Sequence, residues 1–407
     1  MDGARALGSL LGLAVGDALG TTNEFKTMSA PPFPALAEGP VDDVVGGGPF
    51  SLAAGDVTDD TQMAAALAGE LAAAAGATPG AIDAAALAAR YVAWRAIAFD
   101  VGIQIGQALE LVARGVPASE CGRRVWEERQ RFPAGNGALM RTGVIGALWP
   151  APAEARREAS FADAVITHFD PKCQLASAAF NASIAHGVLA ATAPRPTELV
   201  AAAEAELGLA AAALRARHAD LHAEIDAAQA ALAADLVAAR ADDPGLYGAE
   251  VNLQRQAGFV RVAFRLAYWE LLHAPTFTAA LVDVANRGGD ADTNAAITGA
   301  LWGAYAGVDA LPRAWIDRVL RAPGLAEDDG ALHPRALVTA LARLHGDVPS
   351  VGAALAPFPV AVLGLNCATG PVEMAEHVRW LGRHWRRLDL DVPCPSIAYP
   401  YIVHPAL

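Results

Sequence analysis

Cysteine is scarce in this chain of 407 residues, and the few cysteines present are poorly placed to bind one another or a metal. The four of them stand far apart with no C-x-x-C spacing: Cys121, Cys173, Cys367 and Cys394. This arrangement fits neither a disulfide framework nor a structural zinc site. We therefore expect a protein of a reducing compartment, the cytoplasm.

Basic residues are also in the minority. Thirty lysines and arginines stand against 44 aspartates and glutamates, which gives a formal net charge of −14, and no stretch is rich in lysine or arginine. The average field of such a protein repels a nucleic-acid backbone, so we expect no nucleic-acid partner. A phosphate-bearing substrate would need local neutralisation by metal ions, arginines or helix N-termini.

Uninterrupted apolar runs long enough to cross a bilayer are missing. The segment 7–19 resembles a signal peptide in its hydrophobicity, but Asp17 interrupts it and its basic flank consists of Arg5 alone. We expect this segment to be a buried first helix. With no other run of about 20 apolar residues, no membrane association is predicted.

β-Branched and aromatic residues, which favour strands, are sparse. Aromatic residues make up 6% of the chain, and much of the 54% hydrophobic content is alanine, a strong helix former. The fold class predicted is all-α. Helical periodicity is clearest in seven segments: 61–75, 81–94, 103–113, 173–191, 258–273, 277–284 and 293–307.

Composition changes along the chain predict its domains. Residues 1–348 are expected to form one helical domain, in which the alanine-rich stretch 197–245 is an inserted helical hairpin. The hairpin is either a solvated structural insert or a lid. After a boundary near 345–355, residues 349–407 form a C-terminal extension that contains a strand-like run, 360–367.

Two acidic motifs about 230 residues apart carry the chemistry. Gly55-Asp-Val-Thr-Asp-Asp-Thr61 and Gly288-Gly-Asp-Ala-Asp-Thr-Asn294 each crowd carboxylates and a threonine at the start of a helix. One such residue would be an ordinary N-cap. Capping requires only one oxygen, however, and packed like charges repel one another unless a cation is present. The two motifs together therefore favour metal binding.

The candidate ligands are all oxygens, which favours Mg²⁺ or Mn²⁺ over Zn²⁺. Together with Glu24, which follows the small-residue segment 12–20, Asp59, Asp60, Asp290 and Asp292 supply about five negative charges against the four positive charges of two ions. A centre of two Mg²⁺ or Mn²⁺ ions is predicted. Glu24 would act there as a general base or a gate.

Jointly, five motifs over residues 5–320 resemble the ADP-ribosylglycohydrolase family, which includes the dinitrogenase-reductase-activating glycohydrolase. They are Leu13-Ala-Val-Gly-Asp-Ala-Leu-Gly20 with Glu24, Thr58-Asp-Asp-Thr61, Gly135-Asn-Gly-Ala-Leu-Met-Arg141, Thr167-His168, and Gly289-Asp-Ala-Asp-Thr-Asn-Ala-Ala-Ile297. The resemblance implies a compact helical fold with a binuclear metal centre at the mouth of an ADP-ribose cleft.

The resemblance also assigns roles to residues. It implies six metal ligands: Thr58, Asp59, Asp60, Asp290, Asp292 and Thr293. It implies that Asn136, Gly137, Met140, Arg141 and His168 contact the substrate. The residues expected to act in catalysis are Glu24, Asp59, Asp60, Asp292 and, from a short match at 99–102, Asp100.

The expected reaction is metal-dependent hydrolysis of the glycosidic bond between ADP-ribose and an acceptor, with ADP-ribosyl-arginine on a protein as the leading substrate. Water must be placed near the anomeric carbon while the leaving group departs. Alternatives are hydrolysis of O-linked ADP-ribosyl-serine, an ADP-ribose-binding protein without turnover, and a two-metal phosphohydrolase. Retention of all the acidic residues favours an enzyme, and the segment 135–141 disfavours the phosphohydrolase.

The tail resembles a different family. Gly364-Leu-Asn-Cys-Ala-Thr-Gly-Pro371 is similar to a fragment of the homocysteine-binding barrel of cobalamin-dependent methionine synthase, in which the matching cysteine helps to hold zinc. The other zinc cysteines and most of that barrel are missing from this chain. We therefore expect a truncated appendage without methyl-transfer activity.

Overall fold

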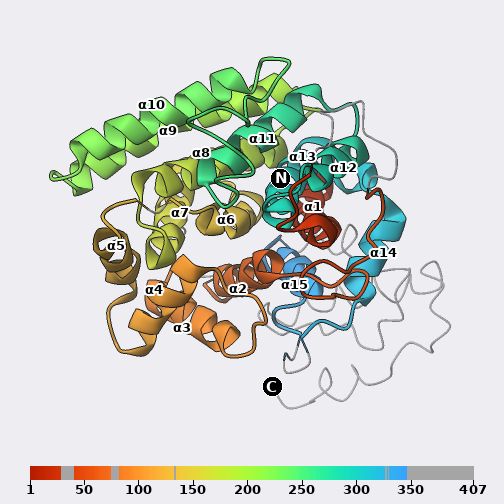
Figure 1. Cartoon of the computed structure of the whole chain (residues 1–407), viewed down its shortest axis with the longest axis horizontal. Coiled ribbons are helices and arrows are strands. Elements are labelled where there is room, and N and C mark those ends of the chain that lie inside the picture. The colour runs from red at the N-terminus through yellow and green to blue at the C-terminus, as the bar shows by residue number, and fades with distance from the viewer. Residues whose placement is uncertain (29–40, 75–81, 133, 326–327, 329, 346–407) are drawn as a thin grey trace, which may run out of the picture. The chain divides into compact units, whose positions relative to one another are not determined.

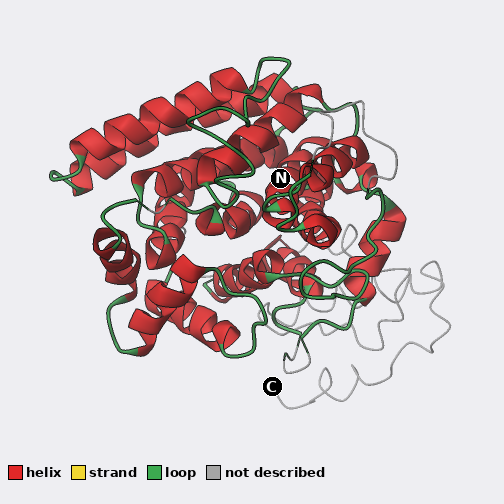
Figure 2. Ribbon diagram, viewed as in Figure 1, coloured by secondary structure: helices red, strands yellow, loops and turns green. Residues whose placement is uncertain are grey.

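The computed structural model describes residues 1–28, 41–74, 82–132, 134–325, 328 and 330–345. Within these residues the chain is a set of helices joined by loops (Figures 1 and 2). The only β-structure in this part of the chain consists of isolated β-bridges. The predicted all-α class is confirmed. None of the helices in this part of the chain is both long and apolar enough to span a bilayer.

Fifteen α-helices and two short 3₁₀ helices follow one another in the described residues. In chain order they are α1 (Gly3–Gly20), η1 (Thr21–Asn23), α2 (Asp59–Ala73), α3 (Ala84–Arg95), α4 (Ile103–Ala113), α5 (Ala118–Glu128), α6 (Gly137–Leu148), α7 (Ala153–Thr167), α8 (Pro171–Leu189), α9 (Pro196–Arg217), α10 (His222–Ala238), α11 (Val260–His273), α12 (Phe277–Arg287), α13 (Ala291–Ala306), η2 (Val308–Ala310), α14 (Arg313–Arg321) and α15 (Pro334–His345).

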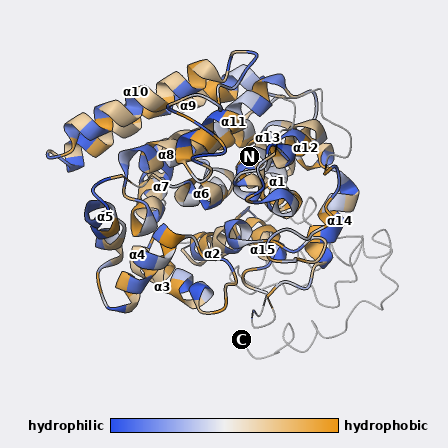
Figure 3. Ribbon diagram, viewed as in Figure 1, coloured by the Kyte–Doolittle hydropathy of each residue, from blue (hydrophilic) through white to orange (hydrophobic). Residues whose placement is uncertain are grey.

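Each of the seven segments with clear helical periodicity contains a helix. The ends differ by up to three residues, because capping rather than periodicity sets them: Asp83 starts α3 by accepting bonds from the backbone of Ala85 and Ala86. Polar helices such as α5 and α14 were not among the seven predicted segments. Figure 3 shows α5 as mainly hydrophilic, and only four of its residues are buried.

Helix α1 lies at the centre of the domain, where its residues from Arg5 to Gly20 are all buried. The expectation that residues 7–19 form a buried first helix is confirmed. Asp2 caps the helix by accepting a bond from the backbone N–H of Arg5 at 3.1 Å. Because the helix is apolar or small on every side, other helices can surround it.

The closest helix pair is formed by α1 and α13, which lie side by side in Figure 1. Glycines at four-residue spacing in α1 face the backbone of α13. A Cβ atom on Gly12 would lie 2.2 Å from the carbonyl oxygen of Gly299, and one on Gly16 would lie 2.0 Å from that of Ala295. The two backbones therefore touch, which fixes the end of α1 against the start of α13.

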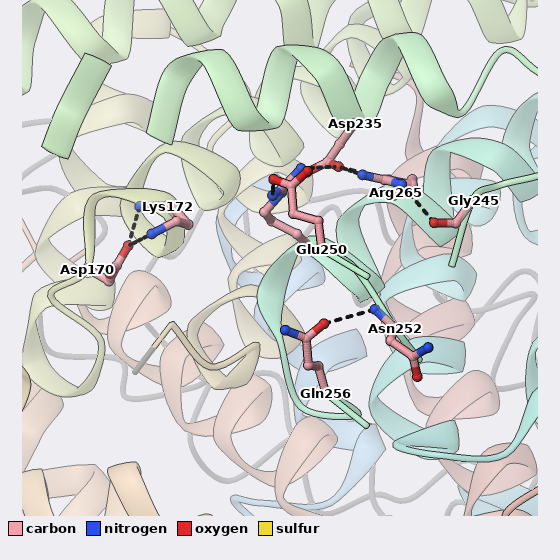
Figure 4. A network of polar contacts seen from close by, with 9 residues as sticks. Asp170, Lys172, Asp235, Gly245, Glu250, Asn252, Gln256 and Arg265 are labelled. Atoms are coloured by element: carbon pink, nitrogen blue, oxygen red, sulfur yellow. Dashed lines mark hydrogen bonds and ion pairs between the residues drawn. The ribbon is translucent and has the colours of Figure 1, made fainter. Parts of the chain in front are cut away.

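The predicted inserted hairpin consists of α9 and α10, which pack on each other and on α8 and α11. Buried Asp235 of α10 ties the hairpin to α11: its carboxylate accepts bonds from Arg261 at 2.7 and 3.0 Å and from Arg265 at 2.8 Å. Figure 4 shows Arg265 between Asp235 and the carbonyl oxygen of Gly245. These buried ion pairs hold α10 against α11, and whether the hairpin is an insert or a lid stays a prediction.

The chain divides after Leu344 into two units, and every feature described below belongs to the first, Met1–Leu344. The strand-like run at 360–367 and the rest of the C-terminal extension lie outside the described residues. The boundaries at 348 and 349 stay predictions.

Candidate functional site

The two acidic helix starts meet in space. Asp60 at the start of α2 and Asp292 at the start of α13 each have a carboxylate oxygen within 4.8 Å of the other, and both are buried. The contact between α1 and α13 places Asp292 against the end of α1, where a Cβ on Gly20 would lie 2.4 Å from the Cα of Asp292. A third carboxylate, that of Asp17 on α1, completes the same cluster.

Asp17 fastens the start of α2 to α1. Its carboxylate accepts bonds from the hydroxyl of Thr58 at 2.9 Å and from that of Thr61 at 2.5 Å. It also accepts the backbone N–H groups of both threonines at 3.1 Å. Asp17 therefore caps α2 from another helix, because Thr58 makes no capping bond with its own side chain.

Within the described part of the chain, only one of the two carboxylate oxygens of Asp60 has hydrogen-bond partners. Its Oδ2 accepts a bond from the hydroxyl of Thr58 at 3.1 Å and one from that of Thr293 at 3.3 Å. Its Oδ1 is buried without a hydrogen-bond partner in the described residues. A buried oxygen of this kind is costly unless something else occupies the space in front of it.

Glu24 reaches the cluster on a loop that is paired with the second acidic motif. The N–H of Phe25 donates to the carbonyl oxygen of Gly289 at 2.7 Å, and the N–H of Gly289 donates to that of Lys26 at 2.9 Å. The Glu24 side chain lies within hydrogen-bonding reach of Asp292 and is 3% exposed, while its Oε2 has no partner. Figure 1 places this loop between α1 and α12.

Asp59 and Asp100 form the outer part of the site. Their carboxyl groups lie within hydrogen-bonding reach of each other, although Asp100 belongs to the loop before α4. Asp290 raises the pKa values of both, so all three share one electrostatic environment. The structure thus brings Asp100, the weakest of the sequence candidates, to the acidic cluster.

Burial is the main influence on the pKa values of this cluster, and mutual repulsion follows. Burial raises the pKa of Glu24 to about 8, with further increases from Asp100 and Asp290. It raises the pKa of Asp17 to about 6 against the opposing hydrogen bonds of the threonines. The pKa values of Asp59, Asp60 and Asp292 are raised well above their usual range, first by burial and then by neighbouring carboxylates. Protons or cations must compensate this charge.

The donor set fits hard divalent cations. Buried carboxylates of Asp17, Asp60 and Asp292 converge from α1, α2 and α13, and Oδ1 of Asp60 has no hydrogen-bond partner there in the part of the chain that the structure describes. Neither histidine nor cysteine belongs to the cluster found among the described residues. Such a set suits Mg²⁺ or Mn²⁺.

The segment 135–141 meets the acidic cluster through Asn136. Its Nδ2 donates to Oδ2 of Asp290 at 2.7 Å, and its carbonyl oxygen accepts the N–H of Met140 at 2.9 Å in the first turn of α6. Gly137 lies against His168, since a Cβ there would be 2.7 Å from Cε1 of the imidazole. Asn136, Gly137, Met140 and His168 therefore form one group beside Asp290.

Arg141 and His168 are both enclosed by protein. The Arg141 side chain is fully buried, donates to Asp163 at 3.0 Å and to Thr167 at 2.9 Å, and packs over the ring of Tyr91. His168 shares the Thr167 hydroxyl at 2.8 Å, and burial lowers its pKa to about 3, so its imidazole is neutral. These bonds favour a supporting role for Arg141 and leave its expected contact with substrate a prediction.

Asp17 was not among the ligands or catalytic residues expected from sequence. It was noticed there only as an interruption of an apolar segment and as part of a motif. A lone carboxylate within a helix of small residues was the available signal, since such a group must find partners when the helix is buried.

Comparison with known proteins identifies the family of this chain. The family model of the ADP-ribosylglycohydrolases matches residues 2–352. ADP-ribosylarginine hydrolase Tri1 from Pseudomonas putida is 30% identical over 330 residues, which are 77% of this chain and 74% of that protein. The ADP-ribosyl-[dinitrogen reductase] glycohydrolase of Rhodospirillum rubrum is 29% identical over 323 residues, with 77% of this chain and 90% of that protein covered.

A solved structure shows the same likeness. A chain of an ADP-ribosylglycohydrolase-related protein complex superposes with a TM-score of 0.57 at 26% identity, covering 84% of this chain and 98% of that one. Separately, methionine synthase of Mycobacterium leprae is 42% identical over 55 residues, 14% of this chain and 5% of that enzyme. This short match supports the resemblance expected for the C-terminal extension.

Proposed function

Since this chain belongs to the ADP-ribosylglycohydrolase family and is thus a hydrolase of glycosidic bonds, we propose that it removes ADP-ribose from arginine side chains of modified proteins with the help of two Mg²⁺ or Mn²⁺ ions. The observation that carries the proposal is the convergence of Asp60 and Asp292 from distant motifs, with Glu24 beside them. The arginine acceptor is inferred from the Pseudomonas relative, which is an ADP-ribosylarginine hydrolase.

The residues that would hold the ions are Thr58, Asp59, Asp60, Asp290, Asp292 and Thr293. Divalent ions bound there would orient the ribose hydroxyls and increase the acidity of a nearby water. Asp17 keeps Thr58 and the first turn of α2 in place, and Asn136 fixes Oδ2 of Asp290. The positions of the carboxylates are thus set by other side chains before a substrate arrives.

In the reaction, the bond between the anomeric carbon and the guanidine nitrogen breaks, and the oxygen of a water bonds to the anomeric carbon. Glu24 would accept a proton from that water, because its free Oε2 lies beside the cluster. The proton that Glu24 accepts would pass to the leaving nitrogen, so arginine and ADP-ribose are released and Glu24 is a carboxylate again. The carboxyl group of Asp100 lies within hydrogen-bonding reach of Asp59 and would hold the Asp59 carboxylate in position.

Binding of the ADP-ribose part is assigned to the group beside Asp290. Asn136, Gly137 and Met140 start α6, whose unpaired N–H groups suit a diphosphate. His168 is neutral and would donate or accept a hydrogen bond rather than contribute a charge. Arg141 supports this segment through its bond to the carbonyl oxygen of Gly137 at 3.0 Å.

Incubation with an ADP-ribosyl-arginine peptide, with Mn²⁺, Mg²⁺ or EDTA, tests the proposal. We expect free ADP-ribose with either metal and no product with EDTA. Release of AMP would identify a phosphohydrolase, and binding without product would identify an ADP-ribose-binding protein. Faster cleavage of an ADP-ribosyl-serine peptide would replace the arginine acceptor by serine. Asp292→Asn should abolish turnover and metal binding, whereas Asp309→Asn, which changes an exposed aspartate, should preserve both.

A further inference from the structure

A cavity of about 670 Å³ lies between α2, α3 and α15, separate from the residues assigned above. Its size falls within the range of sites for small molecules, roughly 300 to 1,000 Å³. Neither the proposed reaction nor the acidic cluster uses it. Helix α2 connects the two places, because it starts at Asp59 and lines the cavity from Ala65 to Ala72.

Positive charge gathers in this cavity. Arg90, Arg335 and Arg343 line it, and Asp328 is the one carboxylate among its described lining residues. Arg90 is paired with Glu70 at 2.9 Å. Arg335, Thr339 and Arg343 are exposed and follow one another at four-residue spacing along one side of α15. The two arginines are therefore separated by about two helical turns. In a chain of net charge −14 such a group is a local exception.

The opposite wall is apolar. It contains alanines of α2, Ile97 and Trp94, and the indole N–H of Trp94 donates to Oε1 of Gln62 at 2.8 Å. That bond satisfies the polar atom of the ring, which is 1% exposed and supports the wall from behind, while Ala93 and Ile97 give the wall its open apolar surface. A ligand that matches both walls needs an anionic group and an apolar body.

We propose that this cavity binds a small organic anion, whose phosphate or carboxylate group is held by Arg335 and Arg343 and whose apolar body packs on the opposite wall beside Ala93 and Ile97. Guanidinium groups recognise both kinds of anion through paired N–H donors. The average field of the protein repels anions, so binding depends on this arginine pair.

Calorimetric titration of the metal-free protein with 1-naphthyl phosphate, in a buffer without phosphate, tests the proposal. Inorganic phosphate and neutral 1-naphthol serve as the two halves of the probe. We expect 1-naphthyl phosphate to bind at least about tenfold more tightly than either half, because it alone satisfies both walls. Binding no stronger than that of inorganic phosphate, or no binding at all, would overturn the proposal.

Variants locate the site. Arg335→Ala/Arg343→Ala should weaken the binding of 1-naphthyl phosphate at least about tenfold. Arg195→Ala/Arg215→Ala, which removes one charge just before α9 and one within it, should leave it unchanged. Ala93→Trp places a large ring in the cavity from an exposed position of α3 and should also block binding. Circular dichroism verifies that each variant is folded. Equal affinities in folded wild type and in both cavity variants would place the probe elsewhere and refute the site.

Discussion

Asp17 and Thr58 are 41 residues apart in sequence, yet the carboxylate of Asp17 accepts both the backbone N–H and the hydroxyl of Thr58. The bond joins the buried first helix to the residue that precedes the first acidic pair. Thr61 adds two more donors to the same carboxylate. The first acidic motif is therefore positioned by a side chain that belongs to neither motif.

Substitution of Asp17 tests this dependence. Asp17→Ala removes the acceptor for both threonines, so the start of α2 loses its cap and the ligand oxygens lose their fixed positions. We expect Mn²⁺ affinity to fall at least about tenfold, with Asp17→Asn intermediate because it keeps one acceptor oxygen. Titration with Mn²⁺, followed by electron paramagnetic resonance, measures the affinity. Wild-type affinity in Asp17→Ala would remove Asp17 from the metal site.

The raised pKa of Glu24 predicts that the metal-free protein loses stability as pH rises. The ordinary value is 4.5 and the folded value is about 8, so between these limits the folded protein retains a proton that the unfolded chain releases. Between pH 6.5 and 8 we expect a loss of about 1 to 2 kcal/mol from this group. His168 opposes this trend weakly: its imidazole is neutral in the fold, whereas in the unfolded chain it titrates near 6.5 and loses its remaining proton between pH 6.5 and 8.

Thermal unfolding in EDTA at pH 6.5, 7.2 and 8 measures the effect. Tm should fall along this series in the wild type, and the fall should be smaller in Glu24→Gln, which cannot ionise. With saturating Mn²⁺ the trend should weaken or reverse, since metal binding requires deprotonated carboxylates. A constant Tm in EDTA would show that Glu24 is not held in its neutral form.

Asp292→Asn should affect stability and metal binding in opposite directions. Burial and the nearby Asp60, Asp290 and Glu24 raise the pKa of Asp292, so its negative charge destabilises the metal-free fold. We expect the variant to unfold at a higher temperature than wild type in EDTA and at a lower one in Mn²⁺. A variant Tm above that of wild type in EDTA and below it in Mn²⁺ would indicate the loss of a metal ligand. General damage to the fold would lower Tm under both conditions.

Gly16→Ala should be among the most damaging small substitutions in the protein. The added Cβ would lie 2.0 Å from the carbonyl oxygen of Ala295, so α1 and α13 must separate. We expect a loss of more than about 2 kcal/mol in the free energy of unfolding and a clear loss of Mn²⁺ affinity. Gly208→Ala in α9 is the matched control, since nothing lies within 4 Å of its Cβ position and alanine favours a helix. A Gly16→Ala variant as stable as wild type would contradict the close contact.

Sequence reasoning predicted the helical class and most of the residues now found around the acidic cluster. Asp60 and Asp292 stood out because carboxylates crowded at a helix start exceed what a cap needs. Their proximity could not be derived from spacing, since it depends on the glycine contacts between α1 and α13. The shared metal site predicted from the charges of the two motifs, and the family resemblance, indicated it beforehand.

Other features depended on packing that sequence patterns do not encode. Arg141 belongs to a motif expected at the substrate, but its guanidinium is enclosed by Asp163, Thr167 and the ring of Tyr91. Asp163 lies 22 residues further along the chain, with no pattern that links the two. Asp17 was overlooked as a functional residue because its partners come from another helix. The metal ligands, catalytic residues and substrate contacts named above remain predictions that the variants test.

The glycine contacts between α1 and α13 determine how rigid the acidic cluster can be. Peptide groups in direct contact leave no side-chain rotamers between them that could rearrange, so the distance from Asp17 to Asp292 cannot adjust by repacking. An ion of the wrong radius would have to be accommodated by bending whole helices. Selectivity among divalent cations would then originate in the backbone of the two helices rather than in the carboxylates that touch the metal.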